Sequence, residues 1–541
     1  MLQPENTSKN YETIFVEIDT GIIKIPKFQR DFVWGKEQTA KLIDSIIKGF
    51  PIGTFIFWRT KEQMRHFRNI GDANLPSTPR GNAALYVLDG QQRLTSLYAA
   101  RKGLIATKEG KRIDFKELTI DLSLAPDDDE TVVFTEKQDG ESFITVYELI
   151  NAGMSYLVEN YTKEDIHKIE TYRNRLTQYN FSCIVIPEHP LDIACEIFTR
   201  INTGGTELSL FEIMVAKTYD EKKKFDFANE YDKLVDSNGS EKDLEDAGYE
   251  TIPTSTVLQC VSAQLCKQVR RKDILKLNKN KFIKEWPIVK DGIFHAVDYF
   301  RNHLRIPVSR LLPYPALLVP FTYFFIRNGG EGPTRIQKKL LVQYFWWASL
   351  SNRFTSGAEG KMAADIKRMD RILKETEPNY KGDEYEITID DLQGCSFSAG
   401  EAFCKAIICL FAYFQPKSFD SDSLVTLGNS WLKQANSKNY HHFFPKSYLK
   451  KMGWENQEAN CILNITLVNA DLNKRKIRAK SPSKYMKQFK RSNNNLNETM
   501  KSHLINDLDA FGVWTDDYKT FIEKRGKQVL KEITKRLKPV I

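Results

Sequence analysis

The stretch YHHFFPKSYLKK at residues 440–451, followed by CILNITLVNADLNKRKIRAK at 461–480, decides how the C-terminal part of this chain folds. The two runs predict a β-hairpin followed by a helix, which would bring their polar side chains to one cleft. Adjacent residues on a strand point to opposite faces unless a bend redirects them. His441 and His442 can therefore offer one imidazole to a metal ion and the other to a water molecule.

This pattern suits phosphodiester hydrolysis, which needs a base to activate water and a cation to stabilise the developing charge. Asn464 and Asn473 follow His442 by 22 and 31 residues, and Asn473 stands directly before a Lys-Arg-Lys run. A His-His pair alone is more often a stacked or surface pair. The prediction therefore rests on the whole pattern in its basic context.

The net charge of +9 is concentrated at the C-terminal end. Residues 441–541 hold 21 Lys and Arg against 10 Asp and Glu, a net charge of +11, whereas the remaining residues hold 58 basic and 60 acidic side chains. Such a segment gains affinity for a polyanion through counterion release. The alternative is a solvated basic face, and charge alone does not decide between them.

The 541 residues, with 41% hydrophobic and 28% charged side chains, are typical of a globular protein of two to four domains. No apolar run is long enough to cross a membrane, and the N-terminus lacks a signal-peptide core, so we expect a cytoplasmic protein without a membrane partner. The cysteines form no CxxC pair, which argues against structural zinc and favours reduced core residues. They are Cys183, Cys195, Cys260, Cys266, Cys395, Cys404, Cys409 and Cys461.

The first 215 residues mix strand and helix patterns. TIFVEI (13–18), ALYVLD (84–89) and FSCIVIP (181–187) predict strands, whereas KEQTAKLIDSIIKGF (36–50) and PLDIACEIFTRIN (190–202) predict helices. Thr206 or Ser209 can cap the next helix. The apolar, aromatic segments between 216 and 395 predict buried helices.

We therefore expect an α+β multidomain protein. Its predicted domains are an α/β domain at 1–215, a mostly helical linker domain at 216–395 and a domain carrying the hairpin at 396–541.

The segment VLDGQQRL at 87–94 predicts a strand that ends in a tight turn before a helix. A helix N-terminus offers free N–H groups to a phosphate, and Gly90 lets the backbone approach. Arg93 can fork onto phosphate oxygens, and Asp89 can bind magnesium. The alternative is a structural turn with a buried Asp–Arg pair.

The C-terminal pattern resembles the HNH, or ββα-metal, nuclease motif. The resemblance implies that His442 is the general base, that Asn464 is a catalytic residue which braces the loop and orients this base, and that His441 and Asn473 hold one divalent metal, usually magnesium. Histidine at 441 departs from the aspartate common in that superfamily, which leaves the metal preference open. The basic residues implied in phosphate contacts are Lys474, Arg475, Lys476, Arg478 and Lys480.

Three N-terminal motifs, IPKFQRDFVWG (25–35), VLDGQQRL and IFTRINTGGTELSLFE (197–212), together with this nuclease pattern, resemble the GmrSD family of type IV restriction enzymes, a broad group that includes SspE and BrxU. The resemblance implies a ParB-like nucleotidase domain fused to an HNH nuclease domain. The implied nucleotide-binding residues are Asp89, Gly90, Gln91, Gln92, Arg93, Arg30, Asn202, Thr203 and Gly204, and Gln29 and Arg30 can also sense modified DNA.

We therefore expect a nucleotide-regulated, modification-dependent DNA endonuclease of bacterial phage defence, with NTPase activity in its N-terminal domain. Expected partners are modified phage DNA, a nucleoside triphosphate and either a second copy of the chain or an accessory defence subunit. Two alternatives remain: a non-catalytic nucleic-acid-binding regulatory protein, and an HNH RNase toxin.

Overall fold

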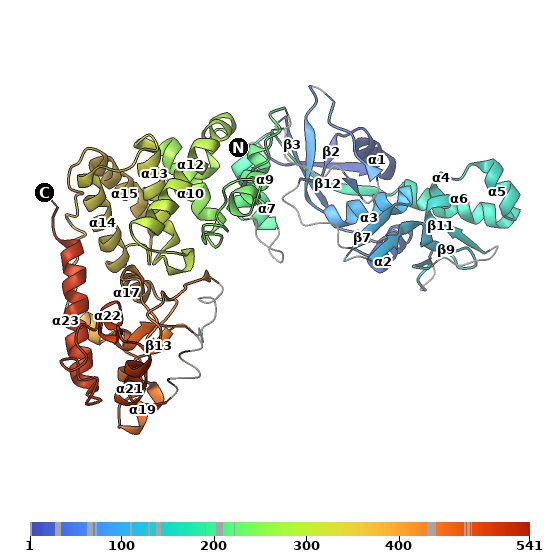
Figure 1. Cartoon of the computed structure of the whole chain (residues 1–541). Helices are drawn as coiled ribbons and strands as arrows, with labels where there is room; N and C mark the ends of the chain where they lie inside the picture. Colours follow the sequence, from blue (N-terminus) through green and yellow to red (C-terminus); the bar gives the residue numbers. More distant parts are fainter. Residues whose placement is uncertain are drawn as a thin grey trace. The chain divides into compact units, whose positions relative to one another are not determined.

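The computed structural model describes residues 3–26, 34–61, 69–70, 73–79, 81–108, 111–127, 130–136, 142–189, 191–201, 209–220, 222–429, 440–469, 472, 477 and 479–540. The chain divides into two compact units, Met1–Phe227 and Ala228–Ile541. It is a mixed α/β protein, as expected from the sequence (Figure 1). The ParB-like and ββα-metal folds of its parts stay predictions.

The first unit is built on a five-stranded mixed sheet with the order β1-β12-β3-β6-β2. The pairs β12–β3 and β2–β6 are parallel, and the other two pairs are antiparallel. A register irregularity between Ile56 and Phe57 lies opposite the end of β6, where the chain turns at Asp89. The strands are β1 (Glu5–Asn10), β2 (Ile23–Lys24), β3 (Phe55–Thr60), β6 (Ala84–Asp89) and β12 (Asn180–Ile186).

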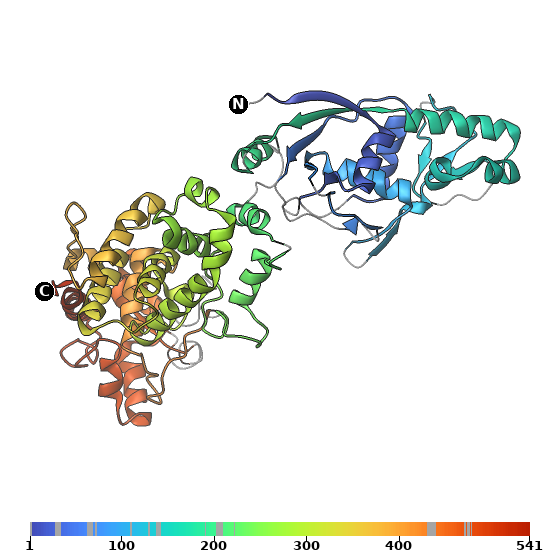
Figure 2. The ribbon, with the colours of Figure 1, turned by 90° about the horizontal axis from the view of Figure 1, so that it is seen from above.

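Helices pack against this sheet around one apolar core, and Figure 2 shows the same unit from above. The helices that contribute to this core are α1 (Tyr11–Asp19), α2 (Lys36–Ile47), α3 (Gln91–Lys102), α4 (Val146–Asn151), α5 (Met154–Asn160) and α6 (Lys163–Thr177). Outside it, α7 (Leu191–Ile201) contacts β6, and α8 (Leu210–Thr218) follows in the chain. Smaller sheets pair β4 (Asn69–Ile70) with β5 (Ala73–Asn74), β7 (Ile105–Lys108) with β8 (Lys111–Asp114), and β9 (Thr119–Asp121) with β10 (Val133–Phe134) and β11 (Phe143–Thr145).

Most N-terminal elements follow the sequence prediction, but the strand expected at TIFVEI is wrong. These residues lie in α1, whose N-terminus is capped by Asn10 through a 2.8 Å hydrogen bond from the Thr13 amide. Ile14, Phe15 and Ile18 are buried at helical spacing. Burial of this face against the sheet outweighs the β propensity of the run. Of the two predicted caps, Ser209 caps α8, and Thr206 lies outside the described residues.

The second unit begins with a helical assembly, which confirms the helices predicted between 216 and 395. Helices α10, α12, α13 and α15 pack against one another, and α14 packs against α17 and α23. The helices are α9 (Phe227–Val235), which starts at the boundary, α10 (Thr254–Cys266), α11 (Arg271–Leu275), α12 (Lys279–Asn302), α13 (Leu318–Arg327), α14 (Arg335–Leu350), α15 (Ala358–Leu373), α16 (Ile389–Gln393) and α17 (Ala402–Tyr413). Across the described residues, no helix combines the length and apolarity that a membrane span needs.

The C-terminal part of this unit surrounds a two-stranded hairpin with short helices. Its core gathers aromatic side chains such as Phe443, Phe444, Tyr485 and Phe521. The elements are β13 (Tyr440–His442), α19 (Lys446–Lys451), α20 (Asn456–Ala459), β14 (Ile465–Leu467), α21 (Pro482–Ser492), α22 (Leu496–Lys501) and α23 (Tyr518–Leu537). The hairpin expected from the sequence is therefore confirmed.

Candidate functional site

The two histidines lie on β13, which pairs antiparallel with β14. His441 stands opposite Thr466, and His442 stands opposite Ile465, directly after Asn464. His441 is 3% exposed, whereas His442 is only partly buried. The ring of His441 lies 6.3 Å from that of Tyr485 on α21. Strand alternation thus gives the two imidazoles different surroundings, as the sequence predicts.

Asn460 holds the imidazole of His442. The Nε2 atom of His442 lies 2.9 Å from Oδ1 of Asn460. The Nδ2 atom of Asn460 donates to Oγ of Ser396 and to the carbonyl of Phe397, both at 2.9 Å. Because a carbonyl can only accept, the amide nitrogen must face Phe397 and the amide oxygen must face His442. A neutral His442 therefore carries its proton on Nε2 and keeps the lone pair of Nδ1.

The protonation of His442 is tuned by its surroundings. Burial of the ring lowers the pKa of His442 below its ordinary value; the hydrogen bond with Asn460 opposes this shift, and the positive charge of Lys446 adds to it. The imidazole is consequently neutral at pH 7 and can accept a proton.

Asn464 braces the turn that follows His442. Its side chain is fully buried and uses all its polar atoms on the backbone. Its Nδ2 donates to the carbonyls of Phe444 and Ala459, both at 2.9 Å, and its Oδ1 accepts from the Phe444 amide at 2.8 Å. The backbone carbonyl of Asn464 also accepts a hydrogen bond from the Phe443 amide at 2.7 Å. Asn464 therefore braces the turn, as expected. Its side chain bonds the backbone, however, and the contact expected to orient the ring of His442 is made by Asn460 instead.

A buried arginine, Arg525, binds the backbone on both sides of Asn464, at the start of β14. Arg525 on α23 donates to the carbonyls of Leu463 and Ile465 at 2.6 and 2.7 Å, on both sides of Asn464. It also donates to the carbonyl of His503, and its guanidinium lies 4.5 Å from the centroid of the Phe411 ring. Burial lowers the pKa of Arg525 to about 9. This cation ties the C-terminal helix to the hairpin.

The second predicted site lies at the turn from β6 to α3 in the first unit. Gly90 adopts φ +90° there, and a Cβ would lie 2.4 Å from the Phe55 ring, so only glycine fits. Gln91 and Gln92 are buried in the first turn of α3. The carboxylate side chain of Asp89 remains 35% exposed. The structure thus brings Asp89 to a glycine turn at a helix N-terminus, as the sequence predicts.

Arg93 is engaged by the protein itself. Its guanidinium donates to the carbonyls of Ile52 and Thr54 and to the carboxylate of Asp89, the last at 3.1 Å. It also lies over the ring of Phe55, 5.1 Å from the centroid. These contacts match the structural alternative for this motif, an Asp–Arg pair that holds a turn. A phosphate would have to compete with three protein acceptors for this side chain.

Ten of the predicted site residues lie outside the part of the chain that the structure describes. Lys480 is described, and its Nζ donates to Oε1 of Gln488 at 3.0 Å. Among the described residues, no group of three or more His, Cys, Asp or Glu side chains is arranged to hold a metal ion. The residues outside the described part are Gln29, Arg30, Asn202, Thr203, Gly204, Asn473, Lys474, Arg475, Lys476 and Arg478. Their roles stay predictions.

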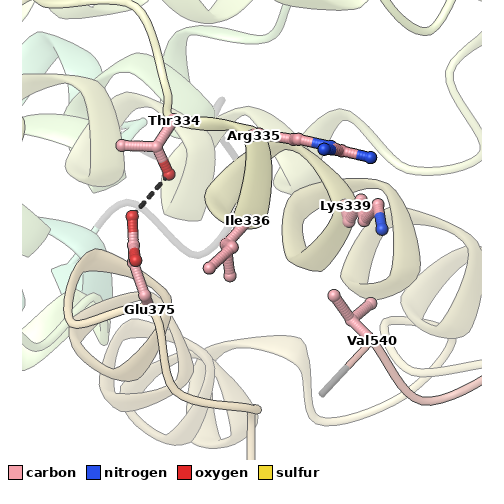
Figure 3. Close-up of a pocket in the computed structure, with 6 residues that line it drawn as sticks. All are labelled: Thr334, Arg335, Ile336, Lys339, Glu375 and Val540. Atoms are coloured by element: carbon pink, nitrogen blue, oxygen red, sulfur yellow. Dashed lines mark hydrogen bonds between the residues drawn. The ribbon is translucent and has the colours of Figure 1, made fainter.

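Two hollows in the second unit do not include His442 in their described lining. The first, of about 520 Å³, opens at the start of α14 (Figure 3), where the Thr334 hydroxyl donates to Glu375 at 2.6 Å. Its described lining includes none of the predicted site residues: Thr334, Arg335, Ile336, Lys339, Glu375 and Val540. The second, of about 420 Å³, is lined in part by Trp454, Cys461 and Tyr518.

Asn460 and Arg525 contact the candidate site, and the sequence did not reveal either of them. Asn460 belongs to no element of the nuclease pattern, and Arg525 lies 60 residues beyond Ile465, whose carbonyl it binds. A polar residue at the end of a short helix gives no periodic signal of its own. Both roles emerge only from the folded contacts.

Comparison with known proteins identifies two domains along the chain. Residues 11–219 match the profile described as the GmrSD restriction endonuclease N-terminal domain, and residues 406–532 match that of the C-terminal domain. The chain is also 23% identical to an uncharacterised protein of Methanocaldococcus jannaschii, over 98% of this chain and 99% of that protein. The first match contains the β6–α3 turn, and the second contains the His441–His442 hairpin, in the order of the family. With both of its domains matched on one chain, this protein belongs to the GmrSD restriction endonuclease family.

Proposed function

We propose that the chain is a metal-dependent HNH endonuclease that cuts DNA with His442 as the general base. The observation that carries this proposal is the hydrogen bond between His442 and Asn460, because it fixes both the ring orientation and the protonated nitrogen. The basic charge of residues 441–541 supports a polyanionic substrate.

In the proposed mechanism, Nδ1 of His442 takes a proton from the water that attacks the phosphorus atom. Nε2 stays protonated and donates to Asn460, so the ring cannot rotate without losing this bond. The lowered pKa of His442 keeps the ring neutral before the reaction. Asn464 and Arg525 keep the hairpin in place while the proton moves.

His441 fits a role as metal ligand, since a neutral imidazole is a ligand for divalent cations. Together with Asn473, it would hold one cation, with magnesium as the proposed ion. Such an ion would stabilise the charge that develops on the phosphate and the leaving oxygen. The buried position of His441, against Tyr485, gives the ligand a fixed orientation.

For the first unit we propose binding and hydrolysis of a nucleoside triphosphate at the β6–α3 turn. The Gly90 turn, the N-terminus of α3 and the partly exposed Asp89 carboxylate support this proposal. Asp89 would bind the magnesium ion of the nucleotide. Because Arg93 already holds the turn, its proposed part is to position Asp89 and Gly90.

We further propose that nucleotide and modified DNA together control cleavage, in the cytoplasm of a cell that defends itself against phage. An unregulated nuclease would damage its host, so restraint needs a difference of several kcal/mol between an active and an inactive state. Glucosylated or hydroxymethylated cytosine and phosphorothioate are the modifications to compare. A second copy of the chain or an accessory subunit can contribute to the same control.

The test measures cleavage of modified and unmodified phage DNA with magnesium, with each nucleoside triphosphate present or absent. His442→Ala should abolish cleavage and keep DNA binding, whereas His167→Ala, an exposed histidine of the first unit, should cut normally. Cleavage that survives in His442→Ala rejects the assignment of the base. Cleavage of RNA alone would identify a toxin-like RNase, and binding without cleavage of any nucleic acid would identify a regulatory protein.

The nucleotide proposal has a separate test. Asp89→Asn keeps the size of the side chain and removes the charge that would bind magnesium. We expect hydrolysis of the nucleotide to be lost while the unit stays folded. If nucleoside triphosphates are hydrolysed equally by both proteins, the turn is structural.

A further inference from the structure

Two thiols meet beside the segment that holds Asn460. The Sγ atoms of Cys395, which follows α16, and Cys404, on α17, lie 3.4 Å apart. Cys404 is fully buried, and Cys395 is partly exposed. Among the described cysteines, these two therefore form a close sulfur pair in which solvent can reach one thiol, that of Cys395.

The thiol of Cys404 also holds the chain between the two cysteines. Its sulfur accepts from the Ser398 amide at 3.4 Å, and its S–H donates to the Ser396 carbonyl at 3.6 Å. The reduced pair thus shapes the short loop 395–398.

This loop is the one on which Asn460 rests. Both hydrogen bonds donated by Asn460 end on Ser396 and Phe397. The backbone continues the contact, because the carbonyl of Cys395 accepts from the Ile462 amide and the carbonyl of Asn460 accepts from the Phe397 amide. The Cys404 thiol is therefore linked to Nε2 of His442 through three hydrogen bonds, by way of the loop and Asn460.

The electrostatics of the pair favour exchange chemistry. A hydrogen bond from the Cys395 thiol, opposed by burial and helped by the Ser398 amide, lowers the pKa of Cys404. The same hydrogen bond raises the pKa of Cys395. The thiolate is the attacking form of cysteine, so Cys404 is the nucleophile in the step that closes the disulfide, whereas Cys395 is the thiol that a small disulfide can reach from solvent.

We propose that Cys395 and Cys404 form a reversible disulfide that reduces nuclease activity by disturbing the Asn460–His442 contact. This inference rests on the proposed function of His442. The oxidant is a low-molecular-weight disulfide. Cys395 attacks it and becomes a mixed disulfide, and the released thiolate takes up the proton of Cys395. Cys404 then attacks the sulfur of Cys395, and its proton goes to the second released thiolate. Two protein thiols are oxidised and one small disulfide is reduced to two thiols.

Oxidation would remove the S–H that binds the Ser396 carbonyl and draw the two sulfurs into a covalent bond. The loop under Asn460 must then change its contacts, and His442 loses its fixed orientation. Losing a group that orients a reactive side chain typically costs 10- to 100-fold, so we expect cleavage to fall by about tenfold.

The experiment treats the full chain with oxidised glutathione and then with dithiothreitol. Peptide mass spectrometry follows the Cys395–Cys404 disulfide, cleavage is measured on DNA carrying glucosylated hydroxymethylcytosine, and hydrogen exchange reports on residues 440–446. We expect the disulfide to form, exchange at 440–446 to rise, cleavage to fall about tenfold, and all three to revert on reduction.

Two variants distinguish the effect of the Cys395–Cys404 disulfide from the effect of oxidation at other cysteines. Cys395→Ser keeps a hydrogen-bond donor and should resist oxidation, whereas Cys266→Ser, an exposed cysteine of α10, should respond like the parent protein. Absence of the disulfide, or a disulfide that leaves exchange unchanged, overturns the inference. If the reduced protein cuts no DNA, the proposed function fails, while disulfide mapping and exchange still decide whether the thiols control the position of His442.

Discussion

Nε2 of His442 lies 2.9 Å from Oδ1 of Asn460, and the two donor contacts of the Asn460 amide fix which of its atoms faces the ring. One side chain thus sets both the orientation and the tautomer of the proposed base. The nuclease pattern in the sequence includes His442 but does not include Asn460, the residue that orients its ring.

Replacement of Asn460 should therefore impair catalysis more than folding. Asn460→Ala removes the acceptor of the Nε2 proton and frees the ring, and we expect cleavage to fall about 10- to 100-fold. The measurement is the single-turnover cleavage rate at pH 7.5. Asn456→Ala, an exposed residue one turn earlier on α20, is the control. Equal rates for the two variants would show that Asn460 does not position the base.

The pH profile should report the pKa of His442. The base must be neutral to act, so the rate should rise with pH through this pKa and level off above it; because burial and Lys446 lower the pKa, the rise should lie below pH 6.5. Lys446→Gln removes a positive charge that disfavours the imidazolium, so the rise should move to higher pH. Lys450→Gln on the same helix should leave it in place. A profile unaffected by Lys446→Gln contradicts this electrostatic contact.

Asn464 should be needed for stability of the hairpin. Asn464→Ala leaves the Phe444 amide and two buried carbonyls without their partner. Each unsatisfied group costs about 1–3 kcal/mol, so the variant should lose about 3 kcal/mol or more. Calorimetry of the full chain should show a lower transition temperature for the second unit only. A transition unchanged from that of the parent would mean that the turn forms without this side chain.

Gly90, at the β6–α3 turn, has a matched control in Gly81, which precedes β6. Gly81 and Gly90 have φ near +90°, but a Cβ at Gly81 meets no atom within 4 Å, whereas at Gly90 it would meet Phe55 at 2.4 Å. Gly81→Ala should cost about 1–2 kcal/mol of backbone strain. Gly90→Ala should cost clearly more and weaken nucleotide binding. Thermal unfolding of the first unit measures the loss of stability, and titration with ATP measures the loss of nucleotide affinity. If the two variants lose the same stability, the contact with Phe55 is not restrictive.

Part of the fold could be read from local pattern. The strand ALYVLD is marked by its β-rich composition, and the helix that begins at Gln91 is marked by the glycine turn before it. The β13–β14 hairpin joins segments far apart in the sequence, so its prediction came from the whole pattern of histidines and asparagines. The TIFVEI segment shows the limit of such reasoning. Its β-branched residues indicate a strand, but a cap at Asn10 and burial on one face make it helical.

In the candidate sites, too, the sequence predicted some features and only the structure showed the others. The chain order of motifs identified the family and named His442, Asn464 and Asp89, since each belongs to a short pattern with fixed spacing. The actual partners could not be predicted. Arg93, for example, is read equally well as a phosphate ligand or as a turn-holding residue until Ile52 and Thr54 are placed beside it.

By itself, the sequence determined which chemical groups this protein carries and in which order, because residue type, spacing and charge are local properties. The tertiary structure alone decided which groups meet: Asn460 with His442, Arg525 with the strand behind them, and Cys395 with Cys404. These contacts depend on how whole helices pack, and packing balances burial against hydrogen bonding over the entire unit.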